Sequence, residues 1–311
     1  MGTFPAVANA PPSSPRAPVL AVSSNKGGVG KTTLAANLAI YFQALREDLP
    51  VLLVGLDDQH TLDRMFALRP PAPGEGHLKH GWAERNLSRV IQLGEYGVHW
   101  VPSPPDVELL KARATDPTIL TRILERTAWN GLVILDTKSD LEALTRNALT
   151  AADRILVPVP DRAGLEEAAK TFALLERQRI DPHRARVVFT LVDRRTRVGE
   201  STPLLTRLMN EVRRRGWPYY KSVLARSPRV EGLNSGTGKP QSILHHAQGT
   251  LIHGQLRDLA AEVLLDVGYA AGPPGPRSVE PQREPRRGAP AWAPDRAMTV
   301  AEGILRALRR R

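Results

Sequence analysis

Short apolar runs alternate with amphipathic segments along most of this chain. Runs rich in β-branched and aliphatic residues occur at 18–23, 51–54, 132–135, 154–159 and 186–192. Each is short enough to be a strand buried on both faces. Apolar positions at helical spacing fill the intervals, notably just after the first run, at 164–178 and at 203–215. The alternation predicts an α/β fold, a mostly parallel β-sheet with helices on both faces, with functional residues at the carboxyl ends of the strands.

The pattern stops near both ends of the chain and so divides it into four parts. Residues 1–17 hold several prolines and no continuous apolar run, which predicts a disordered leader rather than a signal peptide. Residues 18–267 carry the alternation and form the predicted domain, although no element is predicted in the irregular stretch 75–101. Residues 268–294 are rich in proline and arginine and are expected to be an unfolded linker. Residues 295–311 place apolar and basic side chains on opposite arcs, which predicts a basic amphipathic helix.

Composition narrows the classes of function. The 311 residues include no cysteine, which excludes disulfides, thiolate metal sites and iron–sulfur clusters. No segment is apolar over the roughly 18 residues that a membrane span needs, so a cytoplasmic protein is expected. The formal charge of +11 favours an anionic partner, either nucleic acid or anionic lipid. Nine arginines against four acidic residues place +5 of that charge after residue 267.

A glycine-rich segment, SNKGGVGKTT at 24–33, follows the first apolar run. A loop that wraps polyphosphate needs glycines that let backbone N–H groups converge, a lysine for the β/γ charge and a hydroxyl for Mg²⁺. The start of the following helix adds a positive dipole end. Asn25 replaces the first glycine of the G-x-x-x-x-G-K-[ST] pattern. The segment predicts a P-loop NTPase-type site for ATP and Mg²⁺, made by Gly27, Gly28, Val29, Gly30, Lys31, Thr32 and Thr33.

Lys26 adds a second cation to this loop. It would crowd the positive charge of its own site unless it serves another phosphate, and a dimer interface is the way to arrange that. The segment KGGVGKT resembles the signature of the ParA/MinD family of deviant Walker A ATPases. The resemblance covers about residues 19–265, through further pieces such as VLLVGLDDQHTLDRMF, LVILDT and LTRNALTAADRILVPV.

This resemblance implies a role for each matching position. Lys26 corresponds to the signature lysine, which reaches the ATP of the partner subunit in a homodimer. Lys31 and Thr32 would bind the β/γ-phosphates and Mg²⁺ within the subunit. Asp57 falls at the second aspartate of the family's D-x-D pattern, which helps to orient the attacking water. Asp136 matches the Walker B aspartate, which holds Mg²⁺ through its water shell. The expected catalytic residues are therefore Lys26, Lys31, Asp57 and Asp136, and the expected metal site is Thr32 with Asp136.

Three departures from the family pattern concern hydrolysis. Gly55 stands where the first aspartate of D-x-D is usual, and Asp58 stands where a proline is usual. Lys138 and Ser139 replace the Pro-Pro that usually follows the Walker B D-T. The sequence therefore leaves open whether the site activates the attacking water. Asp57 can equally belong to a solvated turn at a strand end.

The family has two branches that act at different places. The partitioning branch binds DNA nonspecifically as an ATP-dependent dimer, and the division-site branch binds membrane through a C-terminal amphipathic helix. Here the C-terminal helix suits DNA, an anionic membrane or a partner protein equally well. Sequence segments such as LDDQ and VDRRTRVGE favour the partitioning branch and a nucleoid location. Arginines that can contact DNA phosphates, each also explicable as an ordinary exposed arginine, are Arg194, Arg195, Arg197, Arg226 and Arg229.

These observations leave one leading hypothesis and several alternatives. The leading one is a ParA-like ATPase for plasmid, chromosome or other cargo, in which a ParB-like or cargo-adaptor protein stimulates slow hydrolysis. The alternatives are a MinD-like membrane-associated positioning ATPase and a nucleotide-gated scaffold with little hydrolysis. A reductase component or an ATP-dependent metabolic ligase is disfavoured, since the related reductases need cluster cysteines.

Overall fold

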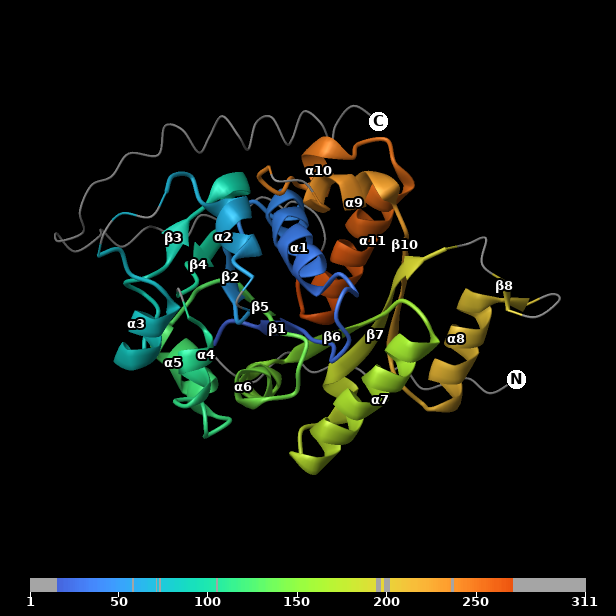
Figure 1. Ribbon diagram of the computed structural model, residues 1–311, viewed down its shortest axis with the longest axis horizontal. Helices are drawn as coiled ribbons and strands as arrows, with labels where there is room; N and C mark the ends of the chain where they lie inside the picture. Colours follow the sequence, from blue (N-terminus) through green and yellow to red (C-terminus); the bar gives the residue numbers. More distant parts are fainter. Residues whose placement is uncertain are drawn as a thin grey trace, which may run out of the picture.

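Eight strands form one sheet in the order β10-β7-β6-β1-β5-β2-β4-β3 (Figure 1). The computed structural model describes residues 16–57, 59–70, 72, 74–104, 106–193, 197–198, 202–235 and 238–270. Neighbouring strands are parallel except β3 and β4. The strands are β1 (Val19–Val22), β2 (Val51–Gly55), β3 (Gln92–Leu93), β4 (His99–Val101), β5 (Leu132–Asp136), β6 (Arg154–Val159), β7 (Ala185–Val192) and β10 (Tyr219–Ala225). A separate antiparallel ribbon joins β8 (Arg197–Val198) to β9 (Thr202–Pro203).

Helices cover both faces of this sheet, as predicted (Figure 1). One layer holds α1 (Lys31–Leu45), α2 (Thr61–Phe66), α9 (Pro228–Ser235), α10 (Ile243–His246) and α11 (Leu251–Asp266). The opposite layer holds α3 (Leu78–Glu84), α4 (Glu108–Lys111), α5 (Ile119–Thr127), α6 (Ala143–Ala151), α7 (Arg162–Arg177) and α8 (Leu204–Arg214). Short 3₁₀ turns occur at Glu95–Gly97 and Pro182–Arg184.

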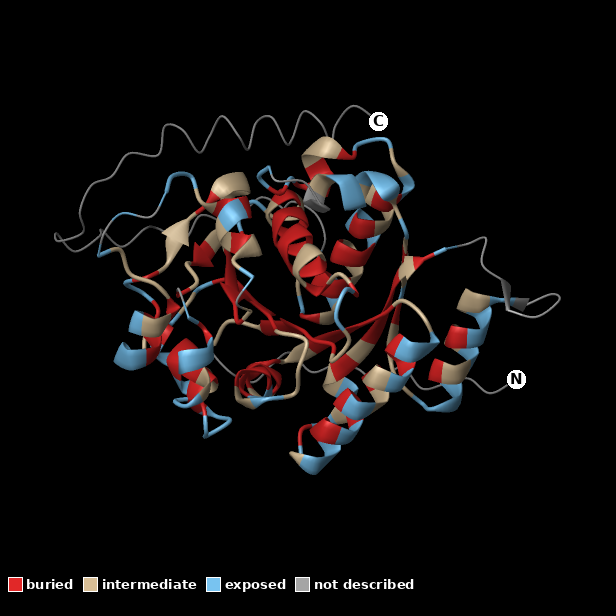
Figure 2. Ribbon diagram, viewed as in Figure 1, coloured by how far each residue is buried: buried red, intermediate tan, exposed pale blue. Residues whose placement is uncertain are grey.

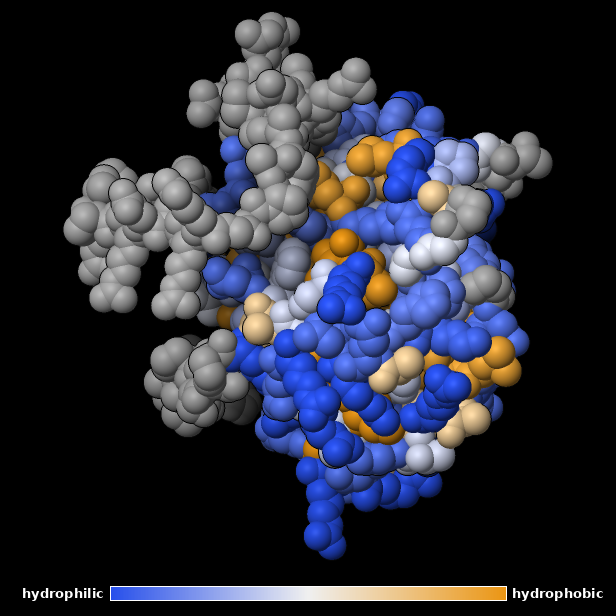
Figure 3. Space-filling model, turned by 90° about the vertical axis from the view of Figure 1, so that its left-hand side faces the viewer, coloured by the Kyte–Doolittle hydropathy of each residue, from blue (hydrophilic) through white to orange (hydrophobic). Residues whose placement is uncertain are grey.

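The central strands are buried on both faces, which explains their continuous apolar runs (Figure 2). Along β1, Val19 and Ala21 face the core under α5 to α8, whereas Leu20 and Val22 face the core under α1 and α11. Helix α1 is buried along most of its length, while α7 and α8 keep polar outer faces (Figure 2). The side of the molecule seen in Figure 3 is mostly hydrophilic, with a few apolar patches. Burial therefore concentrates the apolar residues in two cores that hold the carboxyl ends of the strands in place.

The five strands that the sequence predicted are all present, and the irregular stretch 75–101 contains α3, β3 and β4. Arg16, assigned to the leader, pairs with Asp153 at 2.7 Å. Residues 1–15, the linker from 271 and the predicted helix 295–311 lie outside the described residues. Within the described part, no helix is long and apolar enough to cross a membrane.

Candidate functional site

The loop between β1 and α1 has the geometry of a phosphate cradle. Gly28 and Gly30 have φ of 71° and 85°, a region where residues with a Cβ are strained. Gly27 and Gly28 are exposed, whereas the side chain of Val29 is buried. The Thr190 hydroxyl at the end of β7 donates to the Val29 carbonyl at 3.3 Å. The loop is thus tied to the sheet by Val29, while its glycines stay open to a ligand at the start of α1.

Two predicted residues from other strand ends meet Thr32 of this loop. Thr32, Asp57 and Asp136 line one small hollow, with Asp57 just beyond β2 and Asp136 closing β5. The Leu56 amide donates to the Asp136 carbonyl at 2.8 Å, which fixes the two strand ends side by side. Asp57 and Asp136, which were predicted to follow or close strands, do lie together at the carboxyl ends of β2 and β5.

Asp136 is the buried acid of the hollow. Its side chain is 1% exposed, and among the described residues neither carboxylate oxygen has a hydrogen-bond partner. Burial raises the pKa of Asp136 to about 7, which the Thr32 hydroxyl and the Lys31 ammonium only partly oppose. An orphaned carboxylate beside a threonine hydroxyl is a donor set of hard oxygens that suits Mg²⁺. The residues present therefore fit the predicted magnesium site.

Lys31 is enclosed at the foot of the loop. Its ammonium donates to the Lys26 carbonyl at 3.3 Å and to the Ser139 hydroxyl. Burial lowers the pKa of Lys31, and the carboxylates of Asp136 and Asp57 oppose that effect. A buried cation with only neutral hydrogen-bond partners gains stability from an anionic ligand. The arrangement favours binding of a phosphate chain at this position.

Lys26 pairs with an acid of its own chain. Its ammonium lies 2.8 and 2.7 Å from the two carboxylate oxygens of Asp161. Asp161 is also the N-cap of α7, because the same carboxylate accepts from the Gly164 amide at 2.7 Å. Burial raises the pKa of Asp161, but the Lys26 ammonium and the α7 amides outweigh it and hold this pKa below its ordinary value. The two lysines of the loop therefore occupy separate electrostatic environments.

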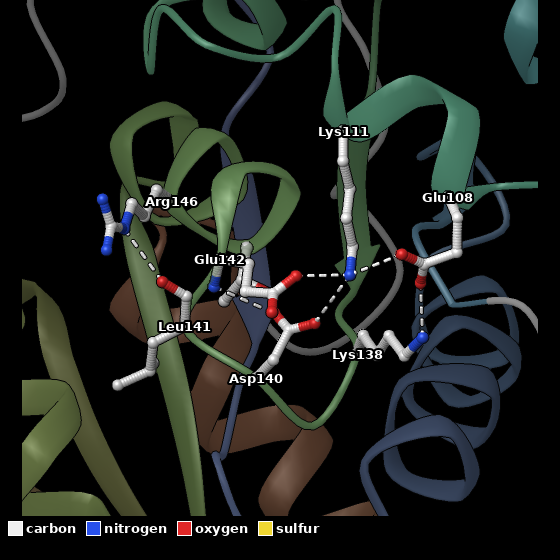
Figure 4. A network of polar contacts seen from close by, with 8 residues as sticks. Glu108, Lys111, Lys138, Asp140, Leu141, Glu142 and Arg146 are labelled. Carbon is white, nitrogen blue, oxygen red and sulfur yellow. Dashed lines mark hydrogen bonds and ion pairs between the residues drawn. The ribbon is translucent and has the colours of Figure 1, made fainter.

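The segment after β5 forms a polar network with α4 (Figure 4). Lys138 pairs with Glu108 at 2.5 Å. Lys111 pairs with Glu108 at 2.6 Å and also contacts Asp140 and Glu142. Figure 4 shows the Lys111 ammonium between the carboxylates of α4 and those of this segment. Lys138, one of the two residues that replace the family's Pro-Pro, thus links the end of β5 to the surface helix α4.

The space around Gly55 explains one departure from the family pattern. A Cβ at this position would lie 3.0 Å from Leu62 Cδ1 and 3.7 Å from Ser103 Oγ. Leu62 on α2 is itself 5% exposed. A first aspartate of the D-x-D pattern would therefore need the Leu62 side chain to shift.

Two of the candidate DNA-contacting arginines, Arg226 and Arg229, follow the carboxyl end of β10 and do not line the hollow of Thr32, Asp57 and Asp136. Arg226 pairs with Glu231 at 2.8 Å, and Arg229 donates to the His246 carbonyl at 2.7 Å. Arg197 lies in β8, but its side chain is not described, and Arg194 and Arg195 lie outside the described residues, as does Asp58.

An apolar cavity lies beside the loop, and no pattern in the sequence predicted it. It has a volume of about 260 Å³ and lies against Gly28 and Gly30. Its walls come from the loop itself and from α1, β7, β10, α9, α10 and α11, which lie far apart in the sequence. The apolar lining residues are Val29, Leu34, Leu191, Leu224, Ala225, Val230, Ile243, Ile252 and Leu256. Only the fold brings them together, and no local spacing in the sequence marks them.

The sheet, the loop and the acids at the strand ends define a P-loop nucleotide-binding protein. The sequence matches the AAA domain family over residues 17–180. It is 34% identical over 262 residues to the chromosome-partitioning ATPase Soj of Thermus thermophilus, covering 81% of this chain and 97% of that protein. The chain therefore belongs to the ParA/MinD family of P-loop ATPases, among the Soj-like partitioning ATPases.

Solved structures agree on the fold. A putative plasmid partition protein from Borrelia burgdorferi bound to AMPPNP superposes with a TM-score of 0.61 at 15% identity, covering 81% of this chain and 99% of that chain. Cobyrinic acid a,c-diamide synthase from Mycobacterium smegmatis, with a bound ATP analogue and magnesium, gives a TM-score of 0.61 at 21% identity, covering 83% and 98%. The predictions of family, fold class and cofactors, ATP and Mg²⁺, are confirmed. Because a synthase shares the fold with a plasmid partition protein, the fold alone does not select the function.

Proposed function

We propose that this protein is a partitioning ATPase that forms an ATP-dependent homodimer, binds DNA without sequence specificity and hydrolyses ATP slowly when a ParB-like or cargo-adaptor protein engages it. The observation that carries the proposal is the separation of the two loop lysines. Lys31 would serve the site of its own chain, while Lys26 pairs with Asp161 and keeps 28% of its side chain exposed. A partly exposed cation beside the loop is available to the nucleotide of a second chain once the Asp161 pair opens.

Each part of the nucleotide has a matching part of the site. Gly27, Gly28 and the amides at the start of α1 would bind the phosphates, with Lys31 against the β/γ charge. Thr32 and Asp136 would hold Mg²⁺, which neutralises charge on the phosphates. Asp57, which lines the same hollow, would orient the attacking water. The apolar cavity beside Gly28 and Gly30 would take the purine base.

The DNA-binding surface belongs to the same proposal. Arg226 and Arg229 follow β10 at an exposed edge, and the basic residues after 267 add charge on the same chain. Phosphate contacts of this kind give affinity without reading bases. Location on the nucleoid would follow from them.

A nucleotide-gated scaffold with little hydrolysis is the second candidate. Two observations favour it. Gly55 leaves no carboxylate at the first D-x-D position, and Lys138 forms an ion pair with Glu108. ATP turnover distinguishes the two functions. We expect DNA and the cognate partner together to raise turnover of the full chain well above that of Lys31→Ala measured under the same conditions. Turnover equal to this variant would exclude the ATPase and support the scaffold.

A further inference from the structure

Ser139 occupies a position that connects the loop lysine to the segment after β5. We propose that Ser139 distinguishes ATP from ADP, because its hydroxyl holds the Lys31 hydrogen that the γ-phosphate must take. Release of Ser139 then passes the nucleotide state through Lys138 to α4. The proposal rests on the proposed nucleotide site and concerns how that site reports its occupant.

Lys31 has a limited number of hydrogen-bond donors for a ligand. An ammonium group has three N–H donors and no acceptor. In this structure one donates to the Lys26 carbonyl at 3.3 Å and a second to the Ser139 hydroxyl. Asp136 takes none of them, since neither of its carboxylate oxygens has a hydrogen-bond partner among the described residues. One donor is left for a ligand while both contacts persist.

ADP and ATP make different demands on these donors. A P-loop lysine reaches both the β- and the γ-phosphate. With ADP, the remaining donor serves the β-phosphate, and both existing contacts are kept. With ATP, two donors go to phosphates, and the Lys26 carbonyl belongs to the loop that wraps the ligand. The contact that has to break is therefore the one to Ser139.

The segment that carries Ser139 is short and fixed at both ends. On one side the Thr137 hydroxyl and amide both donate to the Val22 carbonyl, at 3.0 and 3.3 Å. On the other side Asp140 accepts from the Glu142 amide at 3.0 Å and from the Thr145 hydroxyl at 2.9 Å, which anchors it to the start of α6. Only two residues lie between these anchors, so a movement of Ser139 is transmitted to its neighbour.

That neighbour, Lys138, reaches the molecular surface. It pairs with Glu108, which together with Lys111 spans the single turn of α4 (Figure 4). Next to Glu108 on this turn, Leu109 is 53% exposed. A shift of the 138–139 segment on ATP binding changes the Lys138–Glu108 pair, so the exposed turn of α4 carries the nucleotide state to the exterior.

The test compares the affinities of AMPPNP and ADP, each with Mg²⁺, for the full chain and two variants. The Lys31–Ser139 bond exists in the empty and ADP states and is absent with AMPPNP. Ser139→Ala should therefore tighten AMPPNP binding about tenfold, the order of a hydrogen bond to a charged group, and leave the ADP affinity within about twofold. Ser139→Thr keeps the hydroxyl and should keep the wild-type ratio of the two affinities.

Amide hydrogen exchange of α4 tests the second half of the proposal. AMPPNP, but not ADP, should speed exchange at residues 108–111 of the wild type. Glu108→Gln removes the link without touching Lys31, so it should keep the wild-type affinity ratio and lose the exchange response.

The other possible results overturn the proposal or one of its parts. A loss of both affinities in Ser139→Ala would show that Ser139 binds the ligand itself, and an equal gain or no change in both would show that it does not sense the γ-phosphate. Any of these overturns the proposal. An α4 response that persists in Glu108→Gln overturns the link through Lys138. If the wild type binds neither nucleotide, the proposed function fails as well, which separates that failure from the failure of the sensor alone.

Discussion

Lys26 and Asp161 form an ion pair that has to open before the proposed dimer can form. The pair joins the loop to the start of α7 within one chain, with distances of 2.7 and 2.8 Å to the two carboxylate oxygens. For Lys26 to serve a nucleotide in a second chain, this contact has to open. The pair is partly exposed, and such pairs contribute about 0.2–1 kcal/mol, so opening it costs little compared with binding a phosphate charge.

Asp161→Asn tests this competition at the residue scale. Asparagine retains a side-chain oxygen for the Gly164 amide, so the cap of α7 is kept while the charge that holds Lys26 is lost. The ATP concentration that gives half-maximal dimerisation should fall about two- to fivefold, which corresponds to the energy of a partly exposed pair. Analytical ultracentrifugation across an ATP titration measures it.

A matched control is Asp181→Asn, because Asp181 also accepts from a backbone amide at a turn, that of His183, but does not contact the loop. It should leave the titration unchanged. Weaker dimerisation of Asp161→Asn would mean that Asp161 supports Lys26 in the dimer rather than competing for it.

At the scale of elements, one carboxylate ties α11 to three strands. Asp266 accepts from Arg154 on β6 at 2.9 Å, from Arg186 on β7 at 2.6 and 2.7 Å, and from the Tyr220 hydroxyl on β10 at 2.9 Å. Burial raises the pKa of Asp266, but the two guanidinium groups and the tyrosine hydroxyl outweigh it, so the pKa lies below its ordinary value. The helix that closes the domain, and with it one wall of the apolar cavity, is therefore fixed by this residue.

Asp266→Asn should lower the free energy of unfolding by about 2–3 kcal/mol at pH 7, since it leaves two half-buried guanidinium groups without a charged partner. A depressed pKa contributes stability above the unfolded-state value of about 3.9 that is lost as the pH falls through the folded-state pKa. The difference between wild type and variant should therefore shrink below about pH 4.

Urea denaturation at several pH values measures this effect. Asp258→Asn, on the exposed side of the same helix, should change stability by less than about 0.5 kcal/mol at any pH. A loss in Asp266→Asn that equals this control would show that the cluster does not hold α11.

The sequence predicted the elements that a continuous local pattern marks. It did not predict those that depend on contacts between residues far apart in the sequence. The runs at 51–54 and 132–135 are strands because an uninterrupted apolar run suits a central parallel strand. Strand β10 was not predicted, because it lies at an edge of the sheet and only some of its residues are buried. Lys221, in the middle of the strand, is exposed. Thr32, Asp57 and Asp136 were predicted from the strand-end rule and the family pattern, whereas Asp161 and Ser139 were not. Their contacts to Lys26 and Lys31 span more than 100 residues of sequence. Asp161 stands in no motif, and Ser139 was noted only as a departure from the family's Pro-Pro.

At the scale of the whole molecule, the structure contains one loop with two lysines in different environments. Lys31 contacts Ser139 beside the acids of its own site, and Lys26 pairs with Asp161. Family membership defines the nucleotide that the site binds, and the proposed dimer gives Lys26 a phosphate to contact. The proposed function therefore requires two chains that complete each other's sites when ATP is bound.

Sedimentation velocity of the wild type and of Lys26→Ala, each with and without ATP and Mg²⁺, tests this claim most directly. The wild type should pass from monomer to dimer on addition of ATP. Lys26→Ala should bind ATP with an affinity within a few-fold of the wild type, since Lys31 is intact, and should remain a monomer. Lys221→Ala, which removes an exposed lysine from β10, should behave as the wild type. An ATP-dependent dimer of unchanged affinity in Lys26→Ala would show that Lys26 does not serve the partner's site.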